Sequence, residues 1–160
     1  MRILALLISL IYPACAGHGA HGLPMPGLMD MAHLARPASP NTALAAPAGF
    51  IPAPDIVTPV YPVPAAVLFA AIQAVATGQA RTFPQADFAV QMQADWVVRS
   101  AVFNFPDLVT AQVQPHGGHA STLVLYSRSV YGYSDFGVNH KRVQAWLAAL
   151  AARLPQTAQR

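Results

Sequence analysis

The chain has 160 residues, of which 54% are hydrophobic and only 9% are charged, and its formal net charge is +3. This length predicts a single domain with additional segments. A net charge this small, with no stripe of Lys or Arg, lacks the electrostatic footprint of a nucleic-acid-binding protein. We therefore expect no nucleic-acid partner.

Residues 1–16 are predicted to be a signal peptide. Arg2 is followed by an apolar run over residues 3–12, and a run of about ten residues is too short to span a bilayer. The sequence Ala14-Cys15-Ala16 has the small-x-small form of a cleavage site, which makes Gly17 the first residue of the mature protein. This pattern favours a periplasmic or cell-envelope location.

Two alternatives to simple cleavage remain open. Cys15 is the only cysteine, and its acylation would tether the protein to a membrane, although Tyr12-Pro13-Ala14 is a poor lead-in for lipidation. The other alternative is an uncleaved anchor. If Cys15 is removed, the mature chain has no disulfide, no thiolate nucleophile and no cysteine ligand for a metal.

Residues 17–59 form a proline-rich arm that we predict to be partly disordered. Its proline density disfavours long helices and central strands, while its apolar second half could dock on the core. Thioether and imidazole groups in the first half suit copper, but their irregular spacing favours a flexible tail without a metal, and no cofactor is predicted. The Met and His residues concerned are His18, His21, Met25, Met29, Met31 and His33.

Two amphipathic helices are predicted, over residues 65–77 and 138–153. Apolar residues recur at helical spacing in both. Pro64 suits the first turn of the earlier helix and Gly78 suits its end, while Pro155 ends the later one.

The residues between these helices have the composition of strands, with short turn signals between them. Short links between consecutive strands favour antiparallel pairing. The predicted fold is α+β, a small antiparallel sheet of three to four strands with an N-terminal and a C-terminal helix packed on one face. The domain is predicted over residues 60–155, with a tail at 156–160. The strand-like runs are 88–93, 96–103, 108–114 and 122–130.

The C-terminal half contains a set of short motifs: Ser127-Arg128-Ser129, Gly132-x-Ser134-Asp135-x-Gly137-Val138-Asn139, Arg142, Trp146-Leu147 and Leu150, with Val98-Arg99-Ser100 and Phe105-Pro106-Asp107 upstream. Through these motifs, about residues 60–152 resemble a family of uncharacterised bacterial envelope proteins, DUF1499. The resemblance implies an envelope location but no activity, so no functional residue is inherited from it. His140 stands where the family pattern has Arg, which makes this residue a poor candidate for a shared catalytic role.

Three interpretations of the polar segment 127–142 remain open. In the first, the protein is a non-enzymatic module that binds a small anion, a lipid headgroup or an envelope protein, because Arg side chains near a helix N-terminus suit a phosphate or carboxylate. In the second, it is a hydrolase or transferase that uses Ser134, Asp135 and Arg128. In the third, the segment only caps the helix, and each Arg pairs with Asp107 or Asp135. No catalytic residue is assigned, and the candidate ligand-binding residues are Arg99, Arg128, Ser134, Asp135, Asn139 and Arg142.

Overall fold

The computed structural model describes residues 13–154. Most of the predicted signal peptide and the predicted tail at 156–160 lie outside the described residues. Among those described, no helix has the length and apolar character needed to cross a bilayer.

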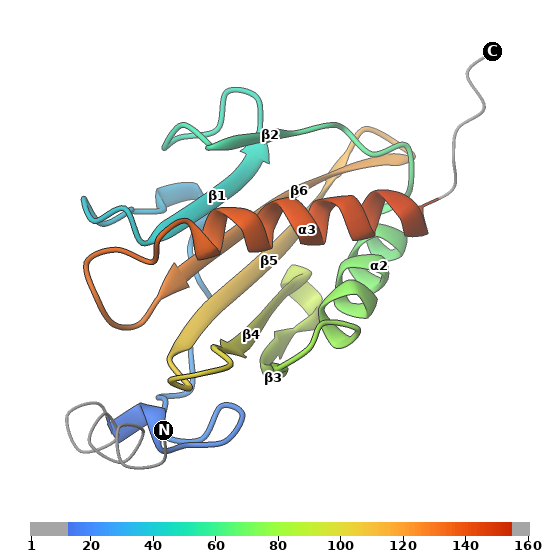
Figure 1. Cartoon of the computed structure of the whole chain (residues 1–160). Helices are drawn as coiled ribbons and strands as arrows, with labels where there is room; N and C mark the ends of the chain where they lie inside the picture. The colour runs from blue at the N-terminus through green and yellow to red at the C-terminus, as the bar shows by residue number, and fades with distance from the viewer. Residues whose placement is uncertain (1–12, 155–160) are drawn as a thin grey trace.

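The centre of the molecule is a six-stranded mixed sheet with the strand order β2-β1-β6-β5-β4-β3 (Figure 1). Strands β1 and β2 pair in parallel, and the other neighbours are antiparallel. The longest pairing, between β5 and β6, joins ten residues of each strand. The strands are β1 Thr42–Pro47, β2 Ile56–Thr58, β3 Thr82–Phe88, β4 Gln93–Arg99, β5 Pro106–His116 and β6 Ala120–Ser129.

This architecture corrects the predicted small antiparallel sheet of three to four strands with an N-terminal helix. The sheet has six strands and is mixed, and helix α2 (Ala65–Thr77) lies mid-chain, after β1 and β2. The two additional strands come from the proline-rich arm. Proline limits β1 only at its last residue, Pro47, and the Ala-rich sequence before it gives no strand signal because alanine has low strand propensity.

A second correction concerns residues 88–93, where the alternation of apolar and polar residues predicts a strand. Ala89–Gln91 instead form a short 3-10 helix, and Met92 has a positive φ of 48°. The strand of this region, β3, lies upstream and contains Pro84. Proline is tolerated there because β3 is an edge strand.

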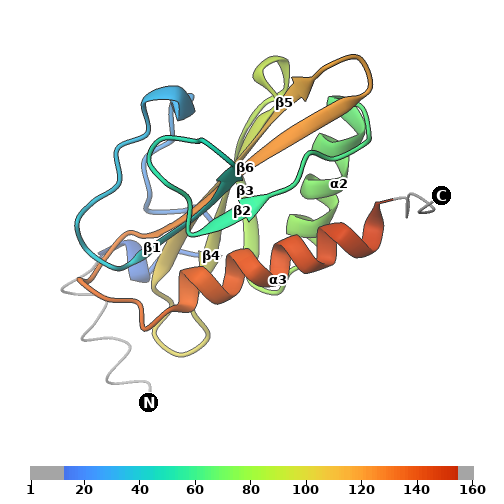
Figure 2. The same ribbon diagram turned by 90° about the horizontal axis from the view of Figure 1, so that it is seen from above.

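Helices α2 and α3 (Val138–Arg153) both cover the same face of the sheet, as Figure 2 shows. Both helices begin and end where the sequence predicts. The core between helices and sheet includes a T-shaped contact between Trp96 of β4 and Trp146 of α3, with ring centroids 5.7 Å apart.

The arm covers the opposite face of the sheet. Met31 lies there in a second apolar cluster with Leu44, Val124 and Tyr126. Because successive strand residues point to opposite faces, β6 contributes Leu123 and Leu125 to the helix side and Val124 and Tyr126 to the arm side. Both faces of the sheet are therefore covered.

Candidate functional site

The corner between β6 and α3 contains four of the six candidate residues. Asp135 caps the helix: its Oδ2 accepts a hydrogen bond from the Asn139 backbone N–H at 2.6 Å and its Oδ1 accepts one from the Gly137 N–H at 3.0 Å. The Ser134 hydroxyl accepts one from the Phe136 N–H at 3.2 Å. These bonds satisfy backbone donors that would otherwise lack partners at the helix start.

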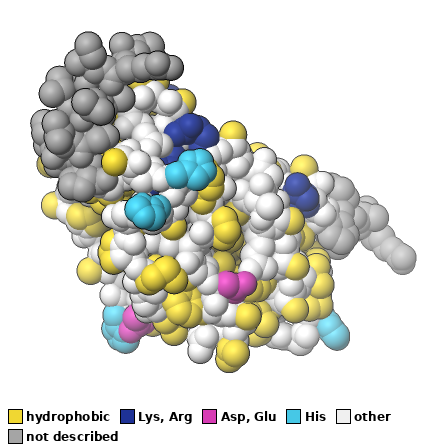
Figure 3. Space-filling view, turned by 90° about the horizontal axis from the view of Figure 1, so that it is seen from below, with side chains coloured by type: hydrophobic (Ala, Val, Ile, Leu, Met, Phe, Trp, Pro, Cys, Tyr) yellow, Lys and Arg dark blue, Asp and Glu magenta, His cyan; other side chains and the backbone are white. Residues whose placement is uncertain are grey.

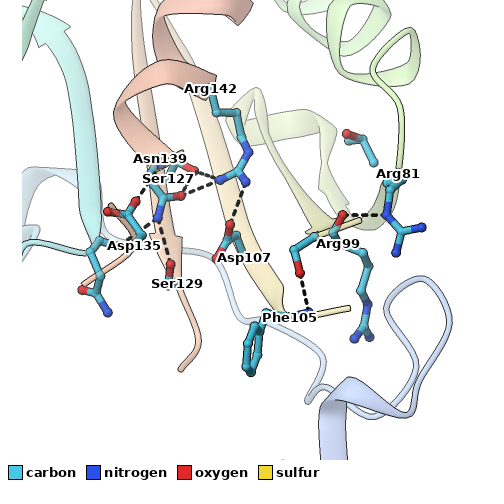
Figure 4. A network of polar contacts seen from close by, with 12 residues as sticks. Arg81, Arg99, Phe105, Asp107, Ser127, Ser129, Asp135, Asn139 and Arg142 are labelled. Carbon is cyan, nitrogen blue, oxygen red and sulfur yellow. Dashed lines mark hydrogen bonds and ion pairs between the residues drawn. The ribbon is translucent and has the colours of Figure 1, made fainter. Parts of the chain in front are cut away.

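Beneath this cap lies a buried polar network, drawn in Figure 4. Arg142 donates to Asp107 at 2.6 Å, to Asn139 Oδ1 at 2.5 Å and to the Ser127 hydroxyl at 2.9 Å. The side chains of Asp107 and Arg142 are only 10% and 11% exposed. The ion pair joins α3 to β5, which is the structural alternative that the sequence left open for this arginine.

Asn139 links the corner to the first strand of the sheet. Its side chain is fully buried, and its Nδ2 donates to the Asn41 carbonyl at 2.9 Å and to the Ser129 hydroxyl at 3.0 Å. Asn41 in turn donates to the Gly132 carbonyl at 2.6 Å. The network therefore fixes the arm as well as the helix, so its members already have partners within the fold.

Arg99 lies at the end of β4 and points toward the N-terminal segment, away from the Arg142 network (Figure 4). Its guanidinium donates to the Gly19 carbonyl at 2.8 Å, the His21 carbonyl at 3.0 Å and the Asn104 carbonyl at 3.2 Å, and also to the Ala14 carbonyl. Arg99 is only 2% exposed. Burial is the main reason that its pKa is lowered.

Arg128 faces the arm side of the sheet, where it lines a hollow of about 700 Å³ beneath residues 29–42. Its Nε is buried and has no hydrogen-bond partner within the described part of the chain. On the same side, Asp95 is 4% exposed; one carboxylate oxygen accepts a hydrogen bond from Thr110 and the other has no partner within residues 13–154. Burial raises the pKa of Asp95, while the Thr110 hydroxyl and the positive charge of Arg128 act in the opposite direction.

The structure therefore separates the three candidate arginines. Arg142 belongs to the network under α3, Arg128 to the hollow beneath the arm, and Arg99 to the N-terminal segment. It brings together Ser134, Asp135, Asn139 and Arg142, with Asp107 and Ser127 added.

A pocket of about 370 Å³ opens at this corner, between the loop after β4 and the loop before α3. Aromatic side chains make much of its wall, and serine and aspartate side chains supply polar groups. Phe136, one of the lining residues, is 90% exposed, and Tyr133, which lies between two lining residues in the chain, is 75% exposed. The lining residues are Ser100, Phe103, Phe105, Asp107, Ser129, Tyr131, Gly132, Ser134, Asp135, Phe136 and Val138.

The sequence analysis missed the aromatic part of this pocket. Tyr131 and Phe136 lie inside the singled-out segment, and aromatic residues in a loop between a strand and a helix were the available signal. Phe103 had no such signal, because residues 96–103 were interpreted as a strand, and Phe105 was noted only as part of the resemblance. The loop after β4 instead places both rings against the corner, with their centroids 5.9 Å apart.

The His and Met residues of the arm that have contacts in the described structure lie in separate surroundings. Among residues 13–154, no group of three or more His, Cys, Asp or Glu side chains could hold a metal ion. Met31 is buried in the arm-side cluster, His18 packs edge-on against Phe83, and His33 pairs with Asp30 at 2.8 Å.

The family model described as "protein of unknown function (DUF1499)" matches residues 34–150, and the chain belongs to this family. The match includes β1 and β2 as well as the corner site. No curated protein and no solved structure matches the chain.

Proposed function

We propose that the protein is an exported, non-enzymatic module of the cell envelope that binds a small amphipathic molecule in the pocket at the β6–α3 corner. The observation that carries the proposal is an apolar pocket of about 370 Å³ rimmed by exposed aromatic side chains. Ligand sites are typically apolar cavities of about 300–1,000 Å³ with a few polar groups that orient the ligand. Large apolar side chains left exposed beside a pocket are typical of such sites.

The polar groups around the pocket favour binding over catalysis. The side chains of Ser134 and Asp135 accept hydrogen bonds from the backbone at the start of α3. No contact in the described part of the chain joins Ser134 to His140, as a nucleophile and its base would require. The hydrolase interpretation therefore has less support than a binding role.

A second candidate, binding of a small anion at Arg128, is favoured by one observation. The guanidinium Nε of Arg128 is buried without a partner beside a hollow of about 700 Å³. Arg is suited to carboxylate and phosphate oxygens. Replacement Arg128→Gln should then abolish any rise in melting temperature produced by inorganic phosphate, since a ligand bound only by the folded state stabilises it.

The corner pocket can be tested with the neutral dye N-phenylnaphthylamine, whose fluorescence rises in apolar surroundings. We expect the dye to bind the wild-type chain and Phe136→Ala to weaken binding by about tenfold, the effect of losing a large part of one aromatic contact. Because Phe136 is 90% exposed, this substitution should leave the melting temperature nearly unchanged.

Val90→Ala is the matched control, since Val90 is also 91% exposed and lies outside the pocket. Equal dye affinity of Phe136→Ala, Val90→Ala and the wild type would contradict the proposal. Export has a separate test, which is mass spectrometry of the N-terminus of the protein recovered from a periplasmic extract.

A further inference from the structure

The N-terminal segment Ala14–His21 occupies a cradle made by Arg99 and Asn104. Arg99 contacts the carbonyl groups of Ala14, Gly19 and His21, and Asn104 Nδ2 donates to the carbonyls of Cys15 at 2.6 Å and Gly17 at 2.9 Å. In all of these bonds the segment contributes only main-chain carbonyl oxygen atoms. Any group that presents oxygen acceptors at the same positions could take its place.

The cradle carries positive charge that no acidic side chain within residues 13–154 pairs with. Among residues 13–154, no acidic side chain forms an ion pair with Arg99 or with its neighbour Arg81. Arg81 instead donates to the Arg99 carbonyl at 2.8 Å and to Asn104 Oδ1 at 2.9 Å. A guanidinium binds a carboxylate more strongly than it binds neutral carbonyl groups, because both bonds become charge-assisted and can form in parallel.

The cradle adjoins the corner pocket. Ser100 and Phe105, which directly follow Arg99 and Asn104 in the chain, both line the pocket, and the Ser100 hydroxyl accepts a hydrogen bond from the Phe105 N–H at 2.9 Å. Figure 3 shows the surface from below, where charged side chains are few and separated among apolar ones. Because Ser100 and Phe105 line the pocket, the apolar chain of a bound ligand would end close to the buried guanidinium of Arg99.

We infer that residues 14–21 cover an anion-binding site at Arg99, and that their release lets the corner pocket accept an amphipathic molecule with a carboxylate head. The inference rests on the proposed function, since it specifies the ligand class of the same pocket. The apolar part of the ligand lies against the aromatic wall, and its carboxylate replaces the carbonyl groups of the segment at Arg99 and Asn104.

The segment fits the cradle tightly enough that a small change releases it. A Cβ atom added at Gly17 would lie 1.9 Å from the His21 carbonyl oxygen and 3.2 Å from Arg99 Nη2. Cleavage after Ala16, as the sequence predicts, would make Gly17 the new N-terminus and place an ammonium group beside the buried guanidinium. Like charges that lie close together repel strongly when they are shielded from water, so processing itself would favour release.

The experiment uses the full chain and dodecanoate, measured by its displacement of N-phenylnaphthylamine. Gly17→Ala should raise the affinity for dodecanoate by about tenfold or more, because a charge-assisted pair becomes available. Gly27→Ala is the matched control, since a Cβ at Gly27 meets nothing within 4 Å, and it should leave the affinity unchanged. Dodecyltrimethylammonium, with the same chain and a positive head, should gain nothing from Gly17→Ala.

Arg99→Gln in the Gly17→Ala background should remove the gain for dodecanoate and retain dye binding, which also shows that the variant is folded. Arg99→Lys, which keeps the charge, should retain part of the gain. An unchanged dodecanoate affinity in Gly17→Ala, or a gain that survives Arg99→Gln, would overturn the inference while leaving the pocket intact. Failure of the wild-type chain to bind the dye would overturn the proposed function and this inference together.

Discussion

The ion pair between Arg142 and Asp107 is the only one among residues 13–154 that joins a helix to the sheet. Both side chains are almost fully buried, so water replaces either partner poorly. The net contribution of such a pair is small when both charges are present, but the loss of one partner leaves the other charge buried and uncompensated.

Arg142→Ala should therefore lower the free energy of unfolding by about 3 kcal/mol or more, measured by urea denaturation. The control is Lys141, the exposed residue next to Arg142 in the chain. Lys141→Ala should change the free energy of unfolding by no more than about 0.5 kcal/mol. Similar values for the two variants would show that the pair is not the structural link described above.

Asp95 provides a pH-dependent prediction at the same scale. Because burial raises its pKa in the folded protein, the folded state holds the proton at pH values where the unfolded chain, with an ordinary pKa of about 3.9, has lost it. The stability contributed by this group is complete below the unfolded pKa and is lost as the pH rises through the folded pKa. Asp95→Asn should therefore raise the melting temperature at neutral pH, and its advantage should vanish near pH 4 or below. If the gain in melting temperature of Asp95→Asn does not change with pH, the raised pKa of Asp95 is not its cause.

At the scale of single elements, helix α3 depends on a side chain that lies outside it. Asp135 accepts hydrogen bonds from two backbone N–H groups at the helix start. Asp135→Ala should lower the free energy of unfolding by about 1 kcal/mol, and Asp135→Asn by less, because the amide oxygen can still accept a hydrogen bond. Chemical denaturation of both variants tests this; an equal loss in the two would attribute the effect to the charge and the helix dipole.

The helices could be predicted from the sequence because apolar spacing, Pro64 and Pro155 all point to the same boundaries. The strand β1 could not be predicted, since five of its six residues are alanine, leucine or proline, which have little strand preference. Its identity as a strand depends on pairing with β6. The interpretation of residues 88–93 failed for a related reason. Alternation alone does not show whether the backbone stays extended, and Met92 adopts a left-handed conformation.

The candidate site was partly predictable for the same physical reasons. Helix capping by Asp135 and an Arg–Asp pair involve side chains whose preferences are local or electrostatic, so the sequence suggested both. Three of the four carbonyl partners of Arg99 lie about 80 residues away in the chain, and a carbonyl group leaves no signal in the sequence. The pocket depends on two loops whose proximity follows only from the sheet order.

At the scale of the whole molecule, the arm is part of the sheet. Strand β1 pairs with β6 over four residues, and Asn41 bonds to the corner network. A fragment of residues 60–155, the domain predicted from sequence, would expose the edge of β6 and the apolar residues beneath the arm.

We therefore expect the fragment 60–155 to lack a cooperative thermal transition, whereas the fragment 34–155, which contains the family match, should retain one. Circular dichroism during heating distinguishes the two. A cooperative transition in the shorter fragment would show that β1 and β2 are accessory to the fold.

The two outer strands have a consequence for behaviour at high concentration. Strand β2 has only three residues, while β3 contains Pro84 and an irregular register between Pro84 and Ala86. A short strand offers few backbone groups to another copy, and a proline removes a donor from the rim, so neither side presents a flat template for intermolecular growth. The chain has an unusually low density of charge, so electrostatic repulsion between copies is weak. Its resistance to fibril formation must therefore come from the backbone of these two outer strands.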